Sequence, residues 1–539
     1  MWAWAVWSKA KNYPMANLDV VDSPVWMESG LVETAQLKTD TKCDVCVVGA
    51  GIAGLLTAER LVAAGMKVVI LDAGPVGGGE TSHTTAHLVT ALDDRYVKLE
   101  NMHGKDGARI AAESHSAAID YVGRLIERLG IDCGWHRVDG YLTVNDRHAN
   151  NRDTLLSAEL DASGRAGVAV ELVANLPAPW PVALGPALRF ARQAQMQPLA
   201  LMKAVARGLI DKGVPLYTGS RVKHVHGGDN ASVQTEGGSV VRCQHVVVAT
   251  NTPFNNLVAV HTKQAGYQTY VVAFRVPAGV LPRALVWDGL WEDDAAYHYV
   301  RLYAGGSVGG GSRAGPGHDL LIVGGEDHRT GQGPKDPGPY PLIEEWTRAH
   351  FPMCGVVERT WSGEVMEPAD GLAYIGHNAM GHKNVYIVTG DSGTGMTHGA
   401  IAAMLIPDLI SGRENPWAKL YDPARKIGLH ALKGYVAENL NTAAQYRDWL
   451  GRGDVKDEGE IKPGHGAIVC QGLTHVAVYK DESGQCTRRN AVCPHLGAIV
   501  RWNDVAKTWD CPAHGSRFDC SGKVMHGPAN THLTPHEPK

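Results

Sequence analysis

The sequence predicts an α/β fold: a parallel sheet flanked by helices, then a mostly antiparallel sheet, then a small all-β domain at the C-terminus. The first part is indicated by a strand, a glycine-rich turn, a helix and a second strand within residues 43–74. The second is indicated by apolar and polar residues that alternate in 268–275 and 296–303, as in strands with one buried face. The third is indicated by short strands and turns after residue 453.

The unit at residues 43–74 has the pattern of a dinucleotide-binding motif. A β-branched apolar strand at 45–48 leads directly into the turn Gly49-Ala50-Gly51-Ile52-Ala53-Gly54, and a helix follows over 55–64. In such a turn Gly49 permits the tight bend, Gly51 lets the backbone approach a pyrophosphate, and Gly54 lets the helix lie close to the sheet. Asp72 ends the next strand, where a carboxylate can accept hydrogen bonds from ribose hydroxyls. A glycine motif with its strand, helix and acid in place strongly indicates a bound dinucleotide.

Length and composition limit the remaining possibilities. A chain of 539 residues holds about two to four domains, and its 44% hydrophobic and 20% charged residues are globular values. A net charge of −5 argues against a nucleic-acid partner, which would be held through phosphate contacts. The sequence contains no run of about eighteen apolar residues, so we expect no membrane span. The N-terminus lacks the pattern of a secretory signal. With ten cysteines in this length, we expect reduced thiols and a cytoplasmic protein.

After the motif, the chain alternates between helices and short strands. Small and apolar residues at helical spacing predict helices over 107–129, 155–166 and 202–212. Apolar runs then predict strands at 221–225, 232–235, 240–241 and 245–249. The last of these runs into Ala249-Thr250-Asn251.

A late glycine-rich loop completes a recognisable set of features. The run Gly390-Asp391-Ser392-Gly393-Thr394-Gly395-Met396-Thr397-His398-Gly399 leads into a helix over 400–410. With the N-terminal motif and the strands RVKHV and VVVATN, it makes the chain resemble the glycine/D-amino-acid oxidase family of flavoproteins over residues 39–423. The resemblance implies an N-terminal extension at 1–35 and an FAD-binding and substrate domain at 36–425. The FAD contacts that it implies are Gly49, Ala50, Gly51, Ala53, Gly54, Asp72, Ala73, Glu80, Thr81, Thr84, Thr85, Ala86, His87, Val222, Ala249, Thr250, Gly393, Met396 and Thr397.

The same resemblance implies a mostly antiparallel sheet that caps the flavin, mainly at 140–200 and 255–365. No residue is assigned as a catalytic base. Arg301 is a candidate to clamp a substrate carboxylate, because a guanidinium binds a carboxylate bidentately; a solvated strand residue or an internal salt bridge is the alternative. His83 falls where related dehydrogenases attach FAD covalently, but its flanking residues differ and a non-covalent polar role is favoured. The candidates for the substrate pocket are His87, Tyr270, Tyr299, Arg301 and His328, with His298 and His398 also near the capping strands or the flavin.

The glycines of 305–317 raise the question of a second nucleotide site. No helix follows them and Pro316 interrupts the run, so an exposed loop or hairpin is the better interpretation. Without a second dinucleotide module, we expect electrons to come from an organic substrate and not from NAD(P)H.

The C-terminal domain, 453–539, follows a helical linker at 426–452 and carries a second motif. The motif consists of Cys493-Pro494-His495 and Cys511-Pro512-Ala513-His514. It resembles the Rieske domain, in which two thiolates bind one iron of a [2Fe-2S] cluster and two imidazoles bind the other. Cys493, His495, Cys511 and His514 would be the ligands. A Cys2His2 zinc site, the other metal interpretation, needs different spacing and usually a helix that carries the histidines.

Two departures from respiratory Rieske proteins bear on the cluster. Ala498 and Ala513 stand where those proteins have a disulfide, and Phe518 stands where they have a tyrosine that donates to a ligand sulfur. Ser516 remains as a hydroxyl donor. Fewer hydrogen bonds to sulfur disfavour the reduced cluster, so we expect a potential of roughly −150 to 0 mV, the lower part of the Rieske range.

A flavin and a one-electron centre in one chain predict a dehydrogenase. A flavin takes two electrons as a hydride, whereas an iron–sulfur cluster carries one at a time. We expect oxidation of a C–N bond in a small amine or amino acid, with electrons leaving FADH2 through the cluster to an external acceptor such as a ferredoxin-like protein, a quinone or O2. A flavin monooxygenase and a non-enzymatic electron carrier or redox sensor are the alternatives.

Overall fold

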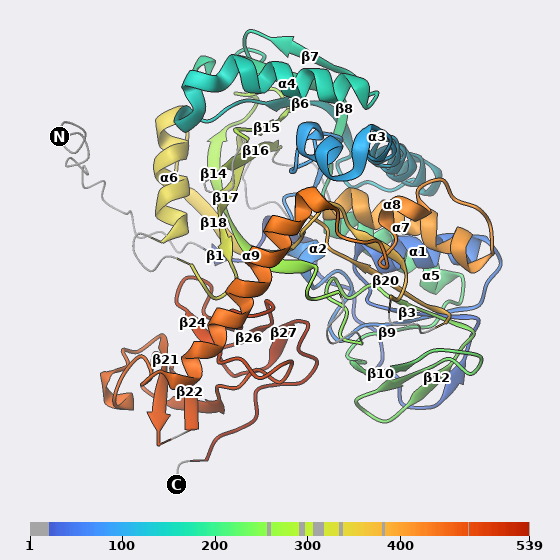
Figure 1. Ribbon diagram of the computed structural model, residues 1–539, viewed down its shortest axis with the longest axis vertical. Helices are drawn as coiled ribbons and strands as arrows, with labels where there is room; N and C mark the ends of the chain where they lie inside the picture. The colour runs from blue at the N-terminus through green and yellow to red at the C-terminus, as the bar shows by residue number, and fades with distance from the viewer. Residues whose placement is uncertain are drawn as a thin grey trace.

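The computed structural model describes residues 21–255, 260–289, 297–304, 317–333, 338–379, 383–472 and 474–537. The glycines of 305–316 and the first twenty residues of the predicted extension lie outside these ranges. We call the described part between residues 21 and 425 the main body and that from 453 to 537 the C-terminal domain. Figure 1 shows the C-terminal domain in orange and red below the main body, with the long helix α9 running between them.

The parallel sheet of the main body forms around the predicted dinucleotide motif. Its strand order is β19-β20-β13-β3-β4-β9, in which β19 alone is antiparallel to its neighbour. Every residue of β3 and β4 is buried, as expected for central strands covered on both faces. The strands are β3 (Val45–Val48), β4 (Val68–Leu71), β9 (Leu216–Tyr217), β13 (His245–Val248), β19 (Tyr374–His377) and β20 (Val385–Thr389). The helices associated with it are α1 (Ile52–Ala63), α5 (Pro198–Asp211), α7 (Gly395–Ile410) and α8 (Ala418–Tyr421).

A small second sheet lies beside it, in the order β10-β11-β12-β2. The strands are β2 (Thr41–Lys42), β10 (Val222–His226), β11 (Ser232–Thr235) and β12 (Val240–Arg242). Val222, Val233 and Val241 are buried and share a core with Cys46 and Val48 of β3. The chain segments predicted as strands between 221 and 249 therefore belong to two different sheets.

The large sheet runs β1-β18-β14-β17-β16-β15-β6-β8-β5, with β7 paired to β8. It is mainly antiparallel, although β1 and β18, and β6 and β15, pair in parallel. It extends beyond the predicted capping ranges, because β1 and β5 also join it. Its strands are β1 (Val21–Asp22), β5 (His87–Leu88), β6 (His136–Leu142), β7 (Val170–Val173), β8 (Ala187–Gln195), β14 (Gln264–Pro277), β15 (Leu285–Trp287), β16 (His298–Tyr303), β17 (His318–Arg329) and β18 (Val357–Pro368). In Figure 1 the helices α4 and α6 lie along its outer side.

Four further helices complete the main body. The helices are α2 (Glu80–His83), α3 (Tyr96–Leu129), α4 (Arg152–Arg165) and α6 (Pro339–His350). Short 3₁₀ turns are η1 (Val25–Ser29), η2 (Asp146–Asn151) and η3 (Val182–Leu184). α3 is kinked at Gly104, where φ is +71°. Of the predicted extension, residues 21–35 are part of the body: Trp26 is fully buried and its indole N–H donates to the carbonyl oxygen of Thr84 at 2.7 Å.

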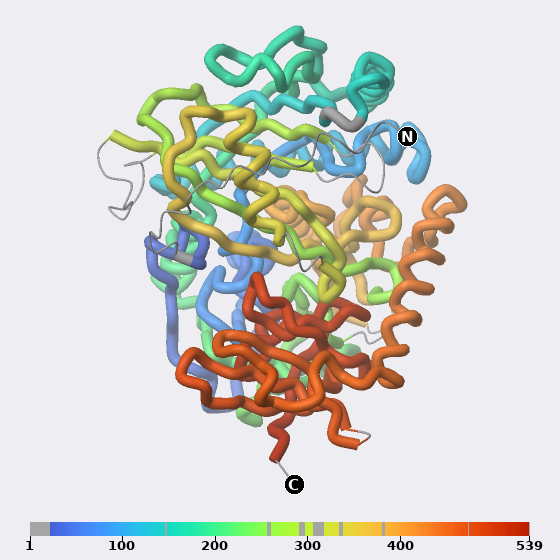
Figure 2. Tube along the Cα trace, turned by 90° about the vertical axis from the view of Figure 1, so that its left-hand side faces the viewer, coloured from blue at the N-terminus to red at the C-terminus, as the bar shows by residue number. Residues whose placement is uncertain are grey.

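The C-terminal domain consists of two small antiparallel sheets. One contains β21 (His465–Gln471), β22 (Thr474–Lys480) and β23 (Cys486–Asn490), and the other contains β24 (Arg501–Asn503), β25 (Thr508–Asp510), β26 (Arg517–Asp519) and β27 (Val524–His526). The connection from the main body is α9 (Leu429–Gln445), followed by η4 (Tyr446–Leu450); η5 (Glu458–Glu460) belongs to the C-terminal domain. Figure 2 shows α9 along one side of the molecule, leading down to this domain.

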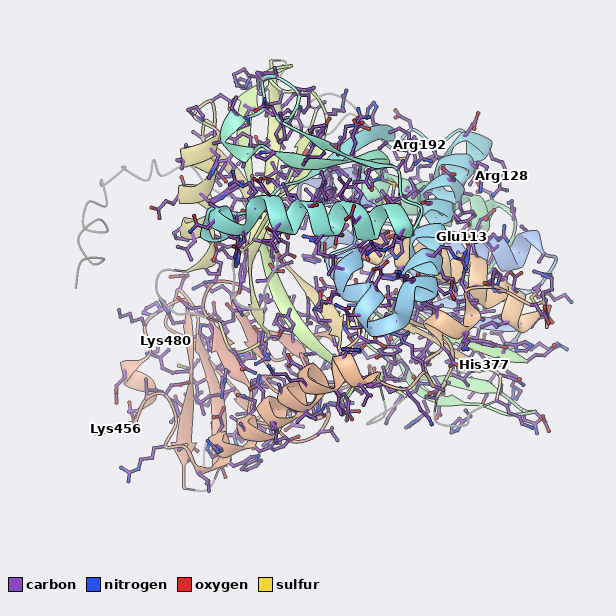
Figure 3. All side chains as sticks on the ribbon, turned by 45° about the horizontal axis from the view of Figure 1, so that its top comes forward. Glu113, Arg128, Arg192, His377, Lys456 and Lys480 are labelled. Atoms are coloured by element: carbon purple, nitrogen blue, oxygen red, sulfur yellow. The ribbon has the colours of Figure 1, made fainter. Side chains whose placement is uncertain are left out.

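Charged side chains of both signs lie on the outer surface. In Figure 3, Glu113 and Arg128 mark α3, while Lys456 and Lys480 mark the opposite, outer side of the C-terminal domain. Arg128 forms a salt bridge of 2.7 Å with Glu59 of α1, which links α3 to α1. In the part of the chain that the structure describes, we find no helix with the length and apolar character needed to span a bilayer.

Candidate functional site

The glycine turn after β3 has the close approaches that its motif predicts. Gly49 has φ of +108°, and a Cβ there would overlap the carbonyl oxygen of Ala249 at the end of β13. A Cβ at Gly54 would overlap the carbonyl oxygen of Gly49. Both positions therefore require glycine, and Gly51 is the residue that precedes the first turn of α1.

Asp72, at the end of β4, braces this turn. Its Oδ2 accepts a hydrogen bond from the Ala50 N–H at 2.6 Å, and its Oδ1 accepts one from the Gly74 N–H at 2.7 Å. Burial raises the pKa of its carboxyl, and these backbone donors oppose that shift. A carboxylate has about four acceptor positions, so Asp72 can hold the turn and still accept from a ribose.

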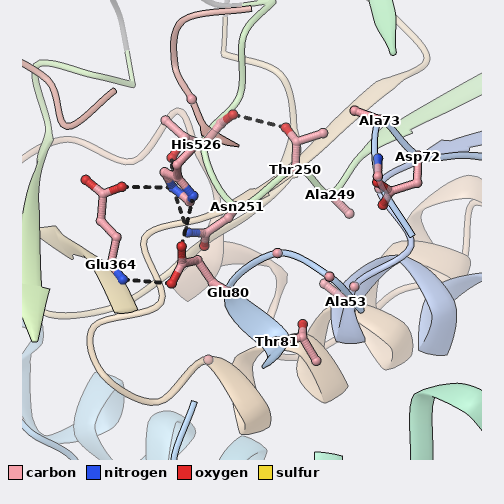
Figure 4. A pocket seen from close by; sticks show the side chains of 18 of the residues that line it. Ala53, Asp72, Ala73, Glu80, Thr81, Ala249, Thr250, Asn251, Glu364 and His526 are labelled. Atoms are coloured by element: carbon pink, nitrogen blue, oxygen red, sulfur yellow. Dashed lines mark hydrogen bonds and ion pairs between the residues drawn. The ribbon is translucent and has the colours of Figure 1, made fainter. Parts of the chain in front are cut away.

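A cavity of about 530 Å³ opens at the carboxyl ends of β3 and β13, within the size range of cofactor sites. Figure 4 shows Ala53, Asp72 and Thr81 on one side of it and His526 on the other. The predicted FAD contacts that line it are Gly49, Gly51, Ala53, Asp72, Ala73, Glu80, Thr81, Thr84, Val222, Ala249, Thr250, Gly393 and Met396. The predicted contacts outside its wall are Ala50, Gly54, Thr85, Ala86, His87 and Thr397.

Arg301 is a buried residue and not a solvated one. It is 1% exposed, and its Nη1 donates to the carbonyl oxygens of Thr85, Ala86 and Met196 at 2.7, 3.2 and 3.1 Å. Burial lowers the pKa of this guanidinium to about 9. Because Nη1 points at the backbone, it holds the segment that follows α2 in place.

The other pocket candidates divide between the capping sheet and the contact with the C-terminal domain. His87 packs edge-on against Trp287 and Tyr299, with ring centroids 5.7 and 6.0 Å apart. Tyr299 reaches the cavity indirectly, through a 2.7 Å hydrogen bond to Thr269, which lines it.

Tyr270 and His328 lie at the domain contact. Their side chains hydrogen-bond at 3.0 Å, and Tyr270 also accepts from the Asn503 amide of the C-terminal domain at 3.2 Å. His298 is held by Asp288 at 2.9 Å and faces Glu326.

The two other histidines singled out from sequence do line the cavity. His83 and His398 both belong to its wall. His398 is 2% exposed; its Nδ1 lies 2.9 Å from the Asp391 carbonyl oxygen, and burial lowers its pKa to about 4. It is therefore a neutral ring at physiological pH.

Carboxylates gather near the late loop and the capping strands. Asp391 lines the cavity, and burial together with the charge of Glu80 raises its pKa to about 6. Because of burial and neighbouring carboxylates, the pKa of Asp93 rises to about 7, that of Asp327 rises to about 6, and that of Glu367 lies well above its usual range. The Tyr297 hydroxyl donates to Asp327 at 3.1 Å. Of these four carboxyls, Asp391 belongs to the cavity wall and the other three do not.

The C-terminal domain supplies part of the cavity wall. The residues concerned are Asp519, Lys523, Val524, Met525, His526, Gly527, Ala529 and Asn530. His526 is 8% exposed, and its ring lies between Glu80 (Nδ1 to Oε1, 3.2 Å) and Glu364 (Nε2 to Oε2, 3.3 Å), as Figure 4 shows.

The charges of this group are set by its neighbours. Burial opposes a charged imidazole, but Glu364 and Glu80 outweigh it and raise the pKa of His526 to about 9. Burial also opposes the charge of Glu80, yet His526 lowers the pKa of that carboxyl to about 2. Burial raises the pKa of Glu364 to about 8. The carboxylate of Glu80 thus favours the charged form of the His526 imidazole.

The predicted metal ligands come together in two pairs. Cys493 and Cys511 are each 1% exposed and lie in one buried core, where their thiols interact with each other and the Ser516 hydroxyl interacts with Cys493. The rings of His495 and His514 lie 4.9 Å apart and perpendicular.

This pairing fits a two-iron cluster. Among the described residues, no three His, Cys, Asp or Glu side chains converge on one metal ion. A Rieske cluster does not need such a point, because each of its irons takes two protein ligands, thiolates on one and imidazoles on the other. Backbone N–H groups of Ala513 and His514 also approach Cys511, as a buried cluster sulfur requires.

The two ligand loops dock against the main body. His261 packs edge-on against His495 and His514, with ring centroids 5.0 and 6.4 Å apart. Its Nε2 lies 2.8 Å from the carbonyl oxygen of Pro253, in the segment that follows the cavity residues Thr250–Thr252. The carbonyl oxygen of Pro512 accepts from the Gln332 amide at 3.0 Å. The imidazole pair therefore faces the main body.

Sequence reasoning missed the residues that join the two domains. Glu364, His261 and the segment 523–530 carry no local motif for cofactor binding, since their role arises only when two domains dock. Gly527-Pro528-Ala529 fits the Rieske pattern, but nothing in that match indicates a second site beside it.

Two family models match the chain. One, described as FAD dependent oxidoreductase, matches residues 44–409, and the other, described as Rieske [2Fe-2S] domain, matches residues 452–537. The "Putative Rieske 2Fe-2S iron-sulfur protein YhfW" of Bacillus subtilis (strain 168) is 29% identical over 92% of this chain and 93% of its own length. The similarity to this relative therefore extends over both matched regions of the chain.

Two further proteins resemble the main body. "Gamma-glutamylputrescine oxidoreductase" of Escherichia coli (strain K12) is 25% identical over 70% of this chain and 85% of its own length. The crystal structure of glycine oxidase from Geobacillus kaustophilus covers 72% of this chain and all of its own, with a TM-score of 0.56 and 18% sequence identity. The second comparison shows the fold of the main body.

Proposed function

The chain belongs to the FAD dependent oxidoreductase family and carries a C-terminal Rieske [2Fe-2S] domain, and from this premise we propose that it is an amine dehydrogenase. It oxidises the C–N bond of a small amine and passes the electrons through its own cluster to an external acceptor. FAD and the cluster are its cofactors.

One observation carries the proposal: a single cavity is walled by both cofactor domains. The glycine turn after β3 and the segment 523–530 face the same space. The imidazoles assigned to the cluster lie against His261 of the main body. Such an arrangement supports electron transfer within one chain, because no diffusion step separates the two centres.

The residues of the cavity have distinct roles in this proposal. When bound, FAD accepts an electron pair as a hydride and the cluster carries single electrons onward. The turn at 49–54 and the N-terminus of α1 receive the pyrophosphate, since free N–H groups and the helix dipole favour negative charge. Asp72 receives the ribose. Cys493, His495, Cys511 and His514 hold the two irons.

The charge of the site favours an amine over an amino acid among the substrates predicted from sequence. Asp391, Asp327 and Asp93 are carboxyls whose raised pKa values record burial and mutual repulsion. An ammonium group placed among them relieves that repulsion, whereas a substrate carboxylate adds to it. Arg301, the cation proposed for a carboxylate, is turned to backbone carbonyls.

The acceptor meets the protein near the cluster. Leu496 follows the ligand His495 and is 39% exposed, and the neighbouring Trp449 and Leu450 of η4 are 42% and 88% exposed. Trp449 donates to the carbonyl oxygen of Gly497 at 2.8 Å, so this apolar surface is continuous with the ligand loop. Small apolar surfaces of this kind suit weak, short-lived electron-transfer encounters.

The test is anaerobic reduction of the purified protein by a panel of amines, N-methyl amino acids and D-amino acids. Bleaching of the flavin and the EPR signal of the reduced cluster are followed in the same sample. We expect an amine without a carboxylate to reduce both centres. Reduction by NAD(P)H with consumption of O2, or no reduction by any member of the panel, would count against the proposal and favour the monooxygenase or carrier alternatives respectively.

A further inference from the structure

The contact between the two domains is centred on the wall of the cofactor cavity. Four elements of the main body meet the C-terminal domain there: α2, the segment after β13, β10 and β18. Asn530 donates to the carbonyl oxygen of Val222 on β10 at 2.7 Å, and Arg221 approaches the carbonyl oxygen of Val524 at 3.4 Å. Val222, Arg221 and Asn530 all line the cavity. The domain contact and the cofactor wall are therefore the same surface.

His526 is the side chain at the middle of this surface. Besides Glu80 and Glu364, it meets Thr252, whose hydroxyl lies 3.2 Å from Nε2, and Asn251, whose amide lies 3.3 Å from the same atom. Glu80 in turn accepts from the backbone N–H of Glu364 at 2.7 Å. One imidazole thus ties α2, β18 and the end of β13 to the C-terminal domain.

The same segment is connected to the cluster loop. The Ala529 N–H donates to the Ser516 hydroxyl oxygen at 2.9 Å, and Ser516 donates to Cys493. Gly515 lies directly against Glu364, where a Cβ on Gly515 would overlap the carboxylate. A displacement of residues 526–529 in the cavity wall would therefore also displace the ligand loop.

We propose that His526 makes the C-terminal domain a structural part of the FAD site, so that FAD binding and docking of this domain are one coupled equilibrium. The inference rests on the assignment of this cavity to FAD under the proposed function. Without the His526 imidazole, Glu80 loses its ion-pair partner on the wall of a site for an anionic cofactor, and only the weaker influence of His83 and Arg517 remains. By linkage, the factor by which docking strengthens FAD binding equals the factor by which FAD strengthens docking.

The first test needs no variant. The protein with its cluster intact is stripped of FAD, and amide hydrogen exchange is measured with and without added FAD. We expect exchange in 524–530 to slow by about tenfold or more on FAD binding, because local opening of this segment then requires loss of the ligand. Strands β21 and β22, on the outer side of the same domain, serve as the internal control and should not change. Equal protection of 524–530 in both states overturns the proposal.

The second test compares three variants for the dissociation constant of FAD. H526Q keeps the size of the side chain and loses its charge, so FAD should bind about tenfold or more weakly, as expected when one partner of a buried charge pair is removed. H526K restores a cation and should recover part of the affinity. H536Q, the same change at a histidine of this domain outside the cavity wall, should bind as the parent does. An H526Q protein with unchanged FAD affinity overturns the proposal, as does an H526K protein no better than H526Q.

Iron content and the EPR spectrum of each variant report whether the cluster domain is folded. If H526Q loses its iron, the exchange experiment on the parent protein still decides the matter. Failure of the proposed function is distinguishable, because a protein that no amine reduces would still bind FAD and still show the ranking of these variants.

Discussion

The imidazole of His261, in the main body, packs edge-on against that of His495, an assigned cluster ligand, with ring centroids 5.0 Å apart. His261 also lies 2.8 Å from the carbonyl oxygen of Pro253, just beyond the cavity residues Thr250–Thr252. A short path of packed groups therefore joins the wall of the FAD cavity to the cluster ligands.

His261→Ala should loosen this contact. An aromatic pair contributes about 1 kcal/mol beyond area burial, so the alanine variant should unfold at lower urea concentration and pass electrons from flavin to cluster several-fold more slowly. His261→Phe keeps a ring in place and is the matched control. Stopped-flow absorbance after anaerobic reduction measures the transfer. Equal transfer rates in both variants and the parent would show that the contact has no part in it.

Gly54→Ala should abolish FAD binding or strongly destabilise the fold, because its Cβ would overlap the carbonyl oxygen of Gly49. Moving backbone apart in a packed core costs about 1–3 kcal/mol or more. Gly208→Ala, in the interior of α5 with open space around it, is the control. It should be neutral or stabilise the protein by about 0.5–1 kcal/mol through helix propensity. Thermal unfolding and flavin content after gel filtration measure both.

The glycine turn illustrates what the sequence can predict. Gly54 and Asp72 have roles set within one strand–turn–helix–strand unit, and local spacing is enough to recognise them; the carbonyl oxygen that Gly49 approaches belongs to Ala249 of β13. The assigned cluster ligands are recognisable for the same reason. Cys493 and His495 lie within one loop, and Cys511 and His514 lie within another.

Arg301 and His526 show where sequence reasoning ends. Arg301 is a cation on a capping strand, and its direction depends on carbonyl groups of Thr85 and Met196, which are distant in sequence. His526 carries no motif, and its position between Glu80 and Glu364 exists only because two domains dock. Side-chain direction and domain docking are long-range outcomes of packing that a local pattern does not contain.

The stability of the protein without FAD should fall as pH rises from about 6.5 to 9. The pKa of His526 is raised from 6.5 to about 9 by Glu364 and Glu80, so the folded chain holds a proton that the unfolded chain has lost. The pKa of Glu364 is raised from 4.5 to about 8 by burial, which acts in the same direction. Glu364→Gln removes the second effect and weakens the first, so its curve should be flatter. Glu345→Gln, on the exposed surface of α6, should follow the parent. Thermal unfolding at several pH values tests this, and parallel curves for parent and E364Q would contradict it.

Asp327→Asn should weaken binding of an amine substrate. The Asp327 carboxylate accepts a hydrogen bond from the Tyr297 hydroxyl, and it is one of the set of carboxyls near the late loop and the capping strands. Loss of one buried carboxylate from a cation site should raise KM by about tenfold or more while kcat changes less, since the interaction is made in the ground state as well. Asp161→Asn, exposed on α4, is the control. An unchanged KM for the amine would contradict the cation site. A KM that falls only for substrates without a positive charge would support it.

Ser516→Ala should lower the reduction potential of the cluster, which we expect between roughly −150 and 0 mV. Ser516 donates to the Cys493 sulfur, and a hydrogen bond to a charged acceptor contributes about 1.5 kcal/mol, which corresponds to about 60 mV for one electron. Phe518 is fully buried in the core that contains both assigned cysteines, so Phe518→Tyr brings a hydroxyl to that region and should raise the potential. Ser483→Ala, in an exposed turn of the same domain, should leave it unchanged. An EPR-monitored redox titration measures all four proteins. A parent potential well above 0 mV, or an S516A value equal to that of the parent, would show that hydrogen bonding at the Cys493 sulfur does not set the potential.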